Sequence, residues 1–288
     1  MIVAVLRGGL GNQLFIYAAA YSLSKHLDLP LYVDDKSGYF KDKYKRKPEI
    51  SALVKNLKLL GLWKVLWLKL FVKKPELSFL LKFLSAFQQI EKVDESNFFN
   101  QSRDPQKIYY LFDYFQSEKY FLDYSEAICQ EIRQFKLPEK YHQIIGTLKS
   151  NALAIHGRLK RAYDANGQLV ALASESKQLD GEYFLKAIAF FGKDNAANNF
   201  VIFSDAPSAF ESLLEGLNAN LISVDKISQG NTVEELILMS KSGKYIISNS
   251  TFSWWGAYLS EKTDKVVIAP PKKFWESDVP ESWHVFAP

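Results

Sequence analysis

The chain has 288 residues, of which 48% are hydrophobic and 24% are charged, and its formal net charge at pH 7 is +4. This length and apolar content can fill two packed domains of ordinary size. A single cysteine, Cys129, excludes an internal disulfide and a metal site built from several cysteines. No run of about 18 uncharged apolar residues is present, which excludes a continuous hydrophobic membrane span.

The chain opens with a strand, a glycine turn and a helix. A β-branched run at 2–6 predicts the strand, and glycines at positions 8, 9 and 11 lead into a helical segment that continues to residue 21. Position 14 is leucine, so the turn lacks the third glycine of the dinucleotide fingerprint, and no Walker lysine follows. The turn therefore argues against a dinucleotide site and excludes a P-loop.

The remainder of the first domain, which we predict to cover 1–140, contains two more strands and an insertion. The strands are predicted at 30–34 and 107–111, and the basic, helical insertion covers 51–91. Pro138 marks the predicted end of this domain.

Positive charge is concentrated in one part of this domain. Residues 36–75 contain twelve Lys or Arg side chains and two acidic ones. The lysine side of a helical wheel is formed by Lys55, Lys58, Lys69 and Lys73, and Trp63 and Trp67, four residues apart, lie on another side. Basic residues with tryptophans at their border are typical of a helix on a membrane surface. Leu62 and Leu66 interrupt this pattern because they fall on the lysine side. Peripheral contact of 51–75 with an anionic membrane and an ordinary packed surface helix therefore remain alternatives.

The expected location of the protein is the cytoplasm, with peripheral contact on the inner face of a bacterial membrane as the further possibility. This expectation depends on the first strand, which begins at Ile2 with no signal peptide before it. We expect no nucleic-acid partner, because no known binding module accompanies the basic segment.

The second predicted domain, 141–288, alternates strands with helices. Such alternation predicts an α/β fold with a doubly wound parallel sheet. Strands are predicted at 152–156, 199–204, 220–224, 244–248 and 265–268, and helices at 180–191, 207–216, 232–240 and 253–260.

The strand at 244–248 leads into a turn rich in hydroxyl groups and then a helix. Helix starts carry unpaired N–H groups and a partial positive charge, so added hydroxyls there favour an anion site. An ordinary helix cap is the alternative. Two adjacent tryptophans follow, and we expect one to pack in the core and the other to line a cavity. The hydroxyl groups belong to Ser250, Thr251 and Ser253, and the tryptophans are Trp254 and Trp255.

Two further strand ends carry polar side chains. The strand at 152–156 is followed by Arg158, whose guanidinium can bind phosphate through paired hydrogen bonds. The strand at 199–204 is followed by Asp205, which can accept hydrogen bonds from a ribose or from guanine, or can cap a helix before Pro207. Because ligands bind at the carboxyl ends of parallel strands, we expect these motifs to converge.

Two long strings resemble glycosyltransferase family 11, the α-1,2-fucosyltransferases. The first is Gly-Gly-Leu-Gly-Asn-Gln-Leu-Phe at 8–15, and the second is Asn-Ser-Thr-Phe-Ser-Trp-Trp-Gly at 249–256. Segments at 201–205 and 234–240 also match. The resemblance covers residues 1 to about 21 and about 150 to 260.

The resemblance implies two Rossmann-like domains that face a cleft, a GT-B-like architecture. It implies inverting transfer of L-fucose from GDP-β-L-fucose to the 2-hydroxyl of a galactoside in a bacterial surface polysaccharide or oligosaccharide. GDP-fucose is then a substrate, and no cofactor is expected. No D-x-D motif occurs in the chain, so we also expect no metal.

The resemblance assigns a role to each matching residue. The predicted catalytic residues are Arg158, His156 and Asn12. The predicted donor-binding residues are Gly11, Asp205, Ser250, Thr251, Phe252 and Ser253. No general base is identified, although Asp34 and Asp35 follow a strand of the first domain.

One motif departs from the family. Where relatives have H-x-R-R-x-D, this chain has His-Gly-Arg-Leu-Lys-Arg at 156–161, with Leu159 and Arg161 as the changed positions. Two alternatives to fucosyl transfer follow: a related enzyme with a different nucleotide-sugar donor, and a non-catalytic protein that binds a nucleotide or a glycan.

Overall fold

The computed structural model divides the chain into two compact units, Met1–Ile132 and Arg133–Pro288. The division falls before Arg133, whereas the sequence places the boundary at residue 140. The structure describes residues 1–73, 89–157, 161–163, 169–171, 179, 181–192, 199–204, 207, 214, 220–272 and 278–286.

The first unit contains a parallel sheet of four strands in the order β2-β1-β4-β3. Ile2 of the central strand β1 pairs with Leu31 on one side and Tyr109 on the other. Both central strands are almost wholly buried, as their apolar sequences predict. The strands are β1 (Ile2–Val5), β2 (Leu31–Asp34), β3 (Gln89–Val93) and β4 (Lys107–Leu111).

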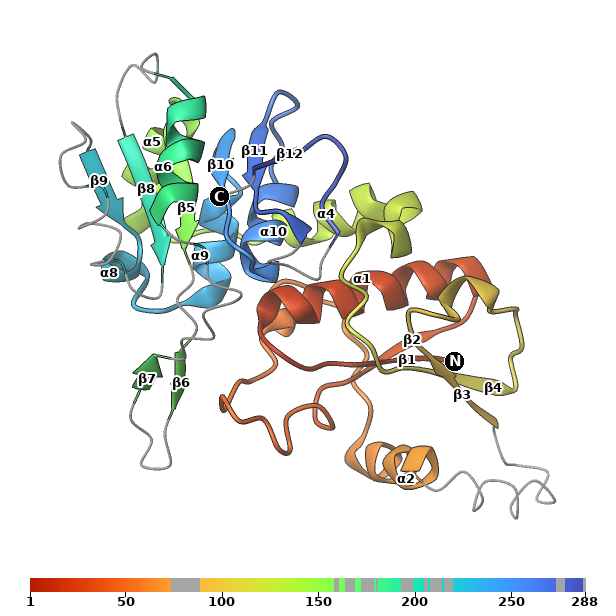
Figure 1. The fold of residues 1–288 in the computed structure, drawn as a ribbon. Helices are drawn as coiled ribbons and strands as arrows, with labels where there is room; N and C mark the ends of the chain where they lie inside the picture. Colours follow the sequence, from red (N-terminus) through yellow and green to blue (C-terminus); the bar gives the residue numbers. More distant parts are fainter. Residues whose placement is uncertain are drawn as a thin grey trace. The chain divides into compact units, whose positions relative to one another are not determined.

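Helices cover both faces of this sheet (Figure 1). On one face lies α1 (Leu10–Leu27), and on the other α2 (Leu62–Lys73) inserts Val65 and Leu68 into a cluster with residues of β1 and β4. The helix α4 (Ser125–Arg133) ends the unit. Short 3-10 helices occur at Ile50–Ala52, Phe98–Asn100, Glu118–Tyr120 and Leu122–Tyr124.

The insertion at 51–91 is helical only in part. Helix α2 begins at Leu62, so Lys55 and Lys58 precede it and do not share its lysine face. The last residues of the insertion belong to β3, where polar and apolar side chains alternate with the period of a strand. The prediction of helix was therefore wrong at both ends, and residues 74–88 lie outside the described part of the chain.

The second unit contains a parallel sheet of six strands in the order β12-β11-β10-β5-β8-β9. The chain passes from β5 to β8 and β9, then returns to the other side of β5 with β10. This reversal makes the sheet doubly wound, so the predicted fold class is confirmed. The strands are β5 (Leu153–Gly157), β8 (Asn199–Ser204), β9 (Asn220–Ser223), β10 (Lys244–Ile246), β11 (Val266–Ala269) and β12 (His284–Val285).

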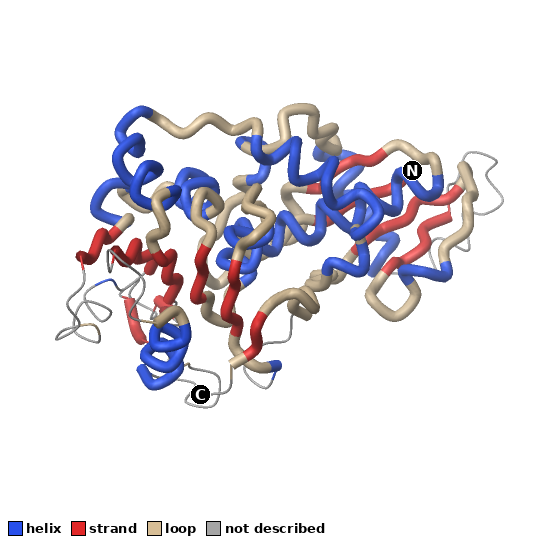
Figure 2. The backbone as a smooth tube through the Cα atoms, turned by 90° about the horizontal axis from the view of Figure 1, so that it is seen from above, coloured by secondary structure: helices blue, strands red, loops and turns tan. Residues whose placement is uncertain are grey.

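Helices also lie on both faces of the second sheet (Figure 2). Helix α6 packs Tyr183, Phe184 and Ala187 onto the sheet residues Ile155, Ile202 and Ile246. The helices are α5 (His142–Lys149), α6 (Gly181–Phe190), α8 (Asp225–Ser228), α9 (Thr232–Met239) and α10 (Thr251–Tyr258), with a 3-10 turn at Glu139–Tyr141.

Three details of this unit differ from the sequence prediction or fall outside it. Helix α10 begins at Thr251, two residues before the predicted start at 253. Most of the predicted helix at 207–216 lies outside the described residues. A two-stranded antiparallel ribbon, β6 (Arg161–Tyr163) and β7 (Leu169–Ala171), follows β5 and was not predicted. In the described part of the chain, no helix is long and apolar enough to cross a membrane.

Candidate functional site

The candidate site lies at the carboxyl ends of β5 and β10, where the strand order of the second sheet reverses. The connections that leave these two neighbouring strands turn in opposite directions, which leaves space for a ligand between them in folds of this type. His156 lies at the end of β5, and the segment from Ser248 to the start of α10 follows β10. Two predicted motifs, separated by about ninety residues in sequence, therefore meet at one sheet edge.

His156 is held by a hydroxyl group and an aromatic ring. Its Nδ1 lies 2.8 Å from the Oγ of Ser248, and its ring centroid is 5.2 Å from that of Phe252. His156 is 7% exposed and Ser248 is 1% exposed, so water competes little for this hydrogen bond. The imidazole orientation is thus fixed at the edge where a ligand would bind.

Ser250 is the N-cap residue of α10, but its side chain does not cap the helix. Its backbone is extended, with φ −138° and ψ 125°, and its hydroxyl makes no capping hydrogen bond. The Oγ is buried and has no hydrogen-bond partner within the described residues. A buried hydroxyl without a partner is unfavourable, so this geometry favours the anion site over the cap.

Ser253 fixes the α10 turn, whereas Thr251 and Phe252 lie where a ligand could contact them. Ser253 is fully buried, and its Oγ lies 3.0 Å from the carbonyl oxygen of Ser250 and 3.3 Å from that of Ser248. It therefore fixes the turn from inside. Thr251 and Phe252 are partly exposed in the first turn of the helix, where backbone N–H groups lack acceptors inside the helix. Of the three predicted hydroxyls, Ser250 and Thr251 remain available to a ligand.

Both tryptophans that follow are core residues, so the prediction that one lines a cavity was wrong. Trp254 and Trp255 are each 0% exposed. Trp254 stacks on Tyr258 at 4.4 Å and donates from Nε1 to the carbonyl of Asp278. Helix α10 is covered on several sides, because Gly256 lets α9 approach so closely that a Cβ there would lie 2.6 Å from the Sδ of Met239.

Two interactions that the sequence analysis missed hold this edge in place. The hydroxyl of Tyr183, on α6, donates to the carbonyl of Ile247 at 2.7 Å, just after β10. On α9, Glu234 accepts from the Tyr141 hydroxyl at 2.7 Å and pairs with Lys140 at 2.8 Å. The hydrogen bond from Lys140 lowers the pKa of Glu234 below its usual 4.5. Both tyrosines lie more than sixty residues from their partners in sequence, so no local pattern indicates these contacts.

The corresponding edge of the first sheet has different chemistry. Gly8 has φ +74°, and Gly9 is the N-cap of α1. Gly11 is buried in the first turn. Asn12 is not a cap, because it lies inside the helix and its Oδ1 accepts from the Nε2 of Gln116 at 2.9 Å. Gly11 and Asn12 thus belong to the first unit, whereas His156 and the serines belong to the second.

Gln13, which the sequence analysis did not select, organises this turn. It is fully buried, and its Nε2 donates to the carbonyls of Gly8 and Lys47 at 3.2 and 3.0 Å. Its Oε1 accepts from the N–H groups of Glu49 and Ile50 at 2.8 and 3.1 Å. A glutamine within the apolar face of a helix was the signal that could have identified it.

Arg7 is a second residue that the sequence analysis missed. Its guanidinium lies over the rings of Phe112 and Tyr114, at 4.6 and 4.3 Å from their centroids. It also donates to the carbonyl of Phe112 and pairs with Asp113 at 3.7 Å. Position 7 therefore ties the end of β1 to the end of β4.

Asp34 and Asp35 have local structural contacts. The Oδ1 of Asp34 accepts from the N–H groups of Lys36 and Ser37 at 3.0 and 2.9 Å, which closes the turn after β2. Asp35 pairs with Lys36. Asp34 is fully buried, and its Oδ2 has no hydrogen-bond partner within the described residues.

Several predicted residues cannot be placed. Arg158 and Asp205 lie outside the described residues, as do Leu159 and Lys160, and of Arg161 only the backbone, in β6, is described. Their roles stay predictions. Within the described ranges, no group of three His, Cys, Asp or Glu residues is arranged to hold a metal ion.

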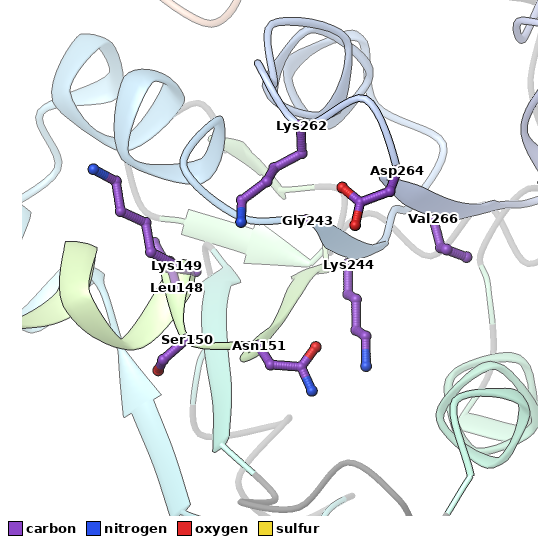
Figure 3. A pocket seen from close by; sticks show the side chains of 9 residues that line it. All are labelled: Leu148, Lys149, Ser150, Asn151, Gly243, Lys244, Lys262, Asp264 and Val266. Atoms are coloured by element: carbon purple, nitrogen blue, oxygen red, sulfur yellow. The ribbon is translucent and has the colours of Figure 1, made fainter.

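A hollow of about 270 Å³ lies at the opposite edge of the second sheet, at the amino ends of β5, β10 and β11 (Figure 3). Lys149, Lys244 and Lys262 line it together with Asp264. Figure 3 shows that the three lysines point in different directions and do not converge on one point. Because it lies at the amino ends, we do not assign the ligand to this hollow.

Comparison with known proteins connects this architecture with sugar transfer. An α-1,2-colitosyltransferase of Escherichia coli is 26% identical over an alignment of 304 positions, gaps included, which covers 98% of each chain. The O-antigen biosynthesis glycosyltransferase WbnK of Escherichia coli is 28% identical over 298 residues, 93% of each chain.

Solved structures show the same fold. The α-1,6-fucosyltransferase NodZ soaked with GDP-fucose has a TM-score of 0.50 at 15% identity, with 90% of this chain and 92% of that chain covered. POFUT1 in complex with GDP-fucose has a TM-score of 0.50 at 11% identity, with 99% and 97% covered. The fold is accordingly GT-B-like.

The family model described as glycosyl transferase family 11 matches residues 1–279, which extends the resemblance across the segments that the two motifs leave unmatched. The chain belongs to glycosyl transferase family 11 and is a glycosyltransferase.

Proposed function

We propose that the protein transfers L-fucose from GDP-β-L-fucose to the 2-hydroxyl of a galactoside in a bacterial surface glycan. The observation that carries this proposal is the α10 turn, where the buried Ser250 hydroxyl and the first-turn N–H groups lie beside the His156–Ser248 pair. This is chemistry for a phosphate group at the carboxyl edge of a doubly wound sheet.

The names of the similar proteins support both the proposed donor and the proposed acceptor. One relative is named for α-1,2 transfer and another for O-antigen biosynthesis. Of the two solved structures of the same fold, one was soaked with GDP-fucose and the other is a complex with GDP-fucose. A nucleotide-sugar donor and a glycan acceptor fit these names. The linkage and the sugar are the parts of the proposal that experiments have to decide.

In the proposed reaction, the acceptor hydroxyl oxygen attacks the anomeric carbon of fucose as the bond from that carbon to the β-phosphate oxygen breaks. The configuration inverts from β to α, the hydroxyl proton is lost to solvent or to a base, and negative charge develops on the departing GDP. The α10 N-terminus and the Ser250 hydroxyl stabilise that charge. His156 orients a phosphate or the guanine, and Arg158, which follows Gly157, adds a permanent positive charge.

Calorimetric titration with GDP in the presence of EDTA tests the site. We expect the wild type to bind GDP without metal and Arg158→Ala to lose most of that affinity, since a charged hydrogen bond to phosphate is worth about 1.5–3 kcal/mol. Loss of binding on EDTA treatment would contradict the metal-free mechanism. GDP binding without turnover of any sugar nucleotide would instead support the non-catalytic alternative.

Product analysis tests the reaction. With GDP-fucose and a galactoside whose 2-hydroxyl is free, we expect GDP release and an α-1,2-linked fucoside, identified by NMR. The matched acceptor is the 2-deoxygalactoside, which should give no product. A product linked through another hydroxyl would contradict the proposed linkage while leaving the donor assignment intact.

A second donor candidate is nucleotide-activated colitose, which the named α-1,2-colitosyltransferase relative favours. Colitose lacks the 3-hydroxyl of fucose. A site that hydrogen-bonds this hydroxyl would reject the deoxy sugar by about 10⁴-fold in kcat/KM, whereas an apolar site discriminates by only about 10–200-fold. The kcat/KM ratio of the two donors therefore decides between them.

A further inference from the structure

The outer face of α2, which we define as Leu62, Trp63, Leu66 and Leu70, is apolar and exposed to solvent. Trp63 is 85% exposed, and the three leucines are between 43% and 49% exposed. In contrast, Val65 and Leu68 on the inner face are 0% exposed and pack on the sheet. Helix α2 is therefore apolar on both sides, although only its inner side packs on the sheet among the described residues of the unit.

The exposed apolar surface extends beyond the helix. Leu59, just before α2, is 49% exposed, and Phe40 is 52% exposed. Phe40 adjoins the helix, because the Nζ of Lys69 lies 4.0 Å from its ring centroid. A contiguous apolar surface of this kind marks an interaction site more often than chance exposure.

The charges on the segment that carries this face have one sign. Residues 51–73 contain five lysines and no acidic residue. Lys55, Lys58 and Lys64 are exposed, and Lys69 lies at the border of the outer face. The surface thus combines apolar side chains with the lysines of the same segment.

The combination of exposed apolar side chains and lysines indicates the kind of partner that this face binds. In a symmetric dimer through the outer face, the lysines of one copy would lie against those of the other, which is unfavourable. A bilayer with anionic headgroups complements both features, since the lysines meet the phosphates while tryptophan and leucine enter the interfacial layer. We propose that the outer face of α2 docks the protein on an anionic lipid surface.

Helix α2 then lies in the plane of the membrane surface, with its inner face still on the sheet. Its twelve residues are too few to span a bilayer, which needs about 20 apolar residues. The inference does not depend on the identity of the sugar donor.

Flotation with lipid vesicles tests the proposal. The full chain should float with vesicles of phosphatidylethanolamine and phosphatidylglycerol, but not with vesicles of phosphatidylcholine alone, and high salt should weaken binding. Combining Leu62→Gln, Trp63→Gln and Leu66→Gln should lower partitioning by about a hundredfold, because the buried apolar area is lost. Combining Lys55→Gln, Lys58→Gln and Lys64→Gln should lower it by about tenfold or more.

The matched control is the double variant Phe99→Gln and Leu122→Gln, which replaces equally exposed apolar side chains elsewhere in the first unit and should float like the wild type. Thermal unfolding of each variant confirms that the fold is retained. Absence of flotation by the wild type, or unchanged flotation of the α2 triple variant, would overturn the proposal. Light scattering that shows a dimer lost in the triple variant, without vesicle binding, would assign the face to a second copy instead.

Discussion

The turn between β1 and α1 and the turn between β10 and α10 both join a buried parallel strand to a helix, but they use their polar side chains differently. In the first turn, the carbonyl of Gly8 accepts from Gln13 and from the Tyr39 hydroxyl, and Asn12 accepts from Gln116. In the second turn, the hydroxyl of Ser250 is buried and has no partner among the described residues.

The Nε of Arg7 in the first turn is also buried without a partner among the described residues, so the comparison concerns the amide and carbonyl groups of the first turn and the serine hydroxyl of the second. The amide and carbonyl groups hold the loops of the first turn, whereas the hydroxyl of Ser250 keeps its capacity for a ligand. Hydrogen bonds already made within the protein contribute to stability, and a ligand has to break them before it can use the same groups. An unpartnered buried hydroxyl costs stability in the free protein and gives that energy back when a ligand binds. Substitutions in the first turn should therefore affect folding, and the matching substitution in the second should affect binding.

The largest expected effect is that of Gln13→Leu in the first turn. It removes four hydrogen bonds and leaves two N–H groups and two carbonyls buried without this partner. We expect the free energy of unfolding to fall by about 3 kcal/mol or more, measured by denaturant unfolding. The control Gln130→Leu removes an exposed hydrogen bond to Glu126 and should change it by less than about 0.5 kcal/mol. Equal losses in the two variants would contradict the role of Gln13.

Substitution of the two glycines of the first turn should have the next largest effect on the free energy of unfolding. Gly8 has φ +74°, and a Cβ there would lie 2.5 Å from the Nδ2 of Asn12, whereas a Cβ on Gly9 meets nothing within 4 Å. Gly8→Ala should cost about 1–2 kcal/mol from backbone strain, with some further loss from the displaced Asn12. Gly9→Ala should be neutral within about 0.5 kcal/mol. Thermal unfolding measures the stability of both variants. A Gly8→Ala variant as stable as the wild type would show that this turn can relax.

The sequence predicted those parts of the molecule that follow from local pattern. Alternating strands and helices identified the doubly wound sheet of the second unit, because β-branched runs and helical periodicity are read within a single segment. The carboxyl-edge position of His156 and of the serine turn followed from the same segmentation. In the first unit, β1, β2 and β4 were predicted for the same reason.

Properties that depend on contacts distant in sequence could not be predicted. Trp254 and Trp255 are both buried because Trp283 and α9 pack against α10, and no pattern within the string indicates these neighbours. Ser250 and Ser253 are the same residue type in one string, yet the hydroxyl of Ser250 has no partner among the described residues and that of Ser253 fixes the turn. Their roles depend on where the helix begins, which pattern reading misplaced by two residues.

These two serines provide the sharpest test of the comparison. Ser250→Ala removes a buried hydroxyl without a partner, so stability should be unchanged or slightly higher, while the affinity for GDP should fall about tenfold. Ser253→Ala removes the contacts to the carbonyls of Ser248 and Ser250 and should cost about 1 kcal/mol of stability. Unfolding and calorimetric titration of both variants separate the two effects. A Ser250→Ala variant that is less stable and binds GDP normally would show that Ser250 has a structural role.

The smallest expected effect concerns the support of the second turn through α9. Lys140 holds the pKa of Glu234 below its usual 4.5, so the pair stabilises the folded state above pH 4.5, and this contribution is lost as the pH falls through the lowered pKa. Because Lys140 is partly exposed, Lys140→Met should cost less than about 1 kcal/mol near neutral pH.

The stability curves of Lys140→Met and the wild type should therefore converge at acid pH, where Glu234 is protonated in both proteins. The control Lys186→Met breaks a more exposed ion pair with Glu182 and should change stability by at most about 0.5 kcal/mol. The Nζ of Lys140 also lies 4.8 Å from the ring centroid of Tyr141. A difference in unfolding free energy between wild type and Lys140→Met that stays constant down to acid pH would show that Lys140 acts by packing on Tyr141 and not through the carboxylate of Glu234. The hydrogen bond from Tyr141 would then be the contact that holds Glu234, and with it α9, beneath the α10 turn.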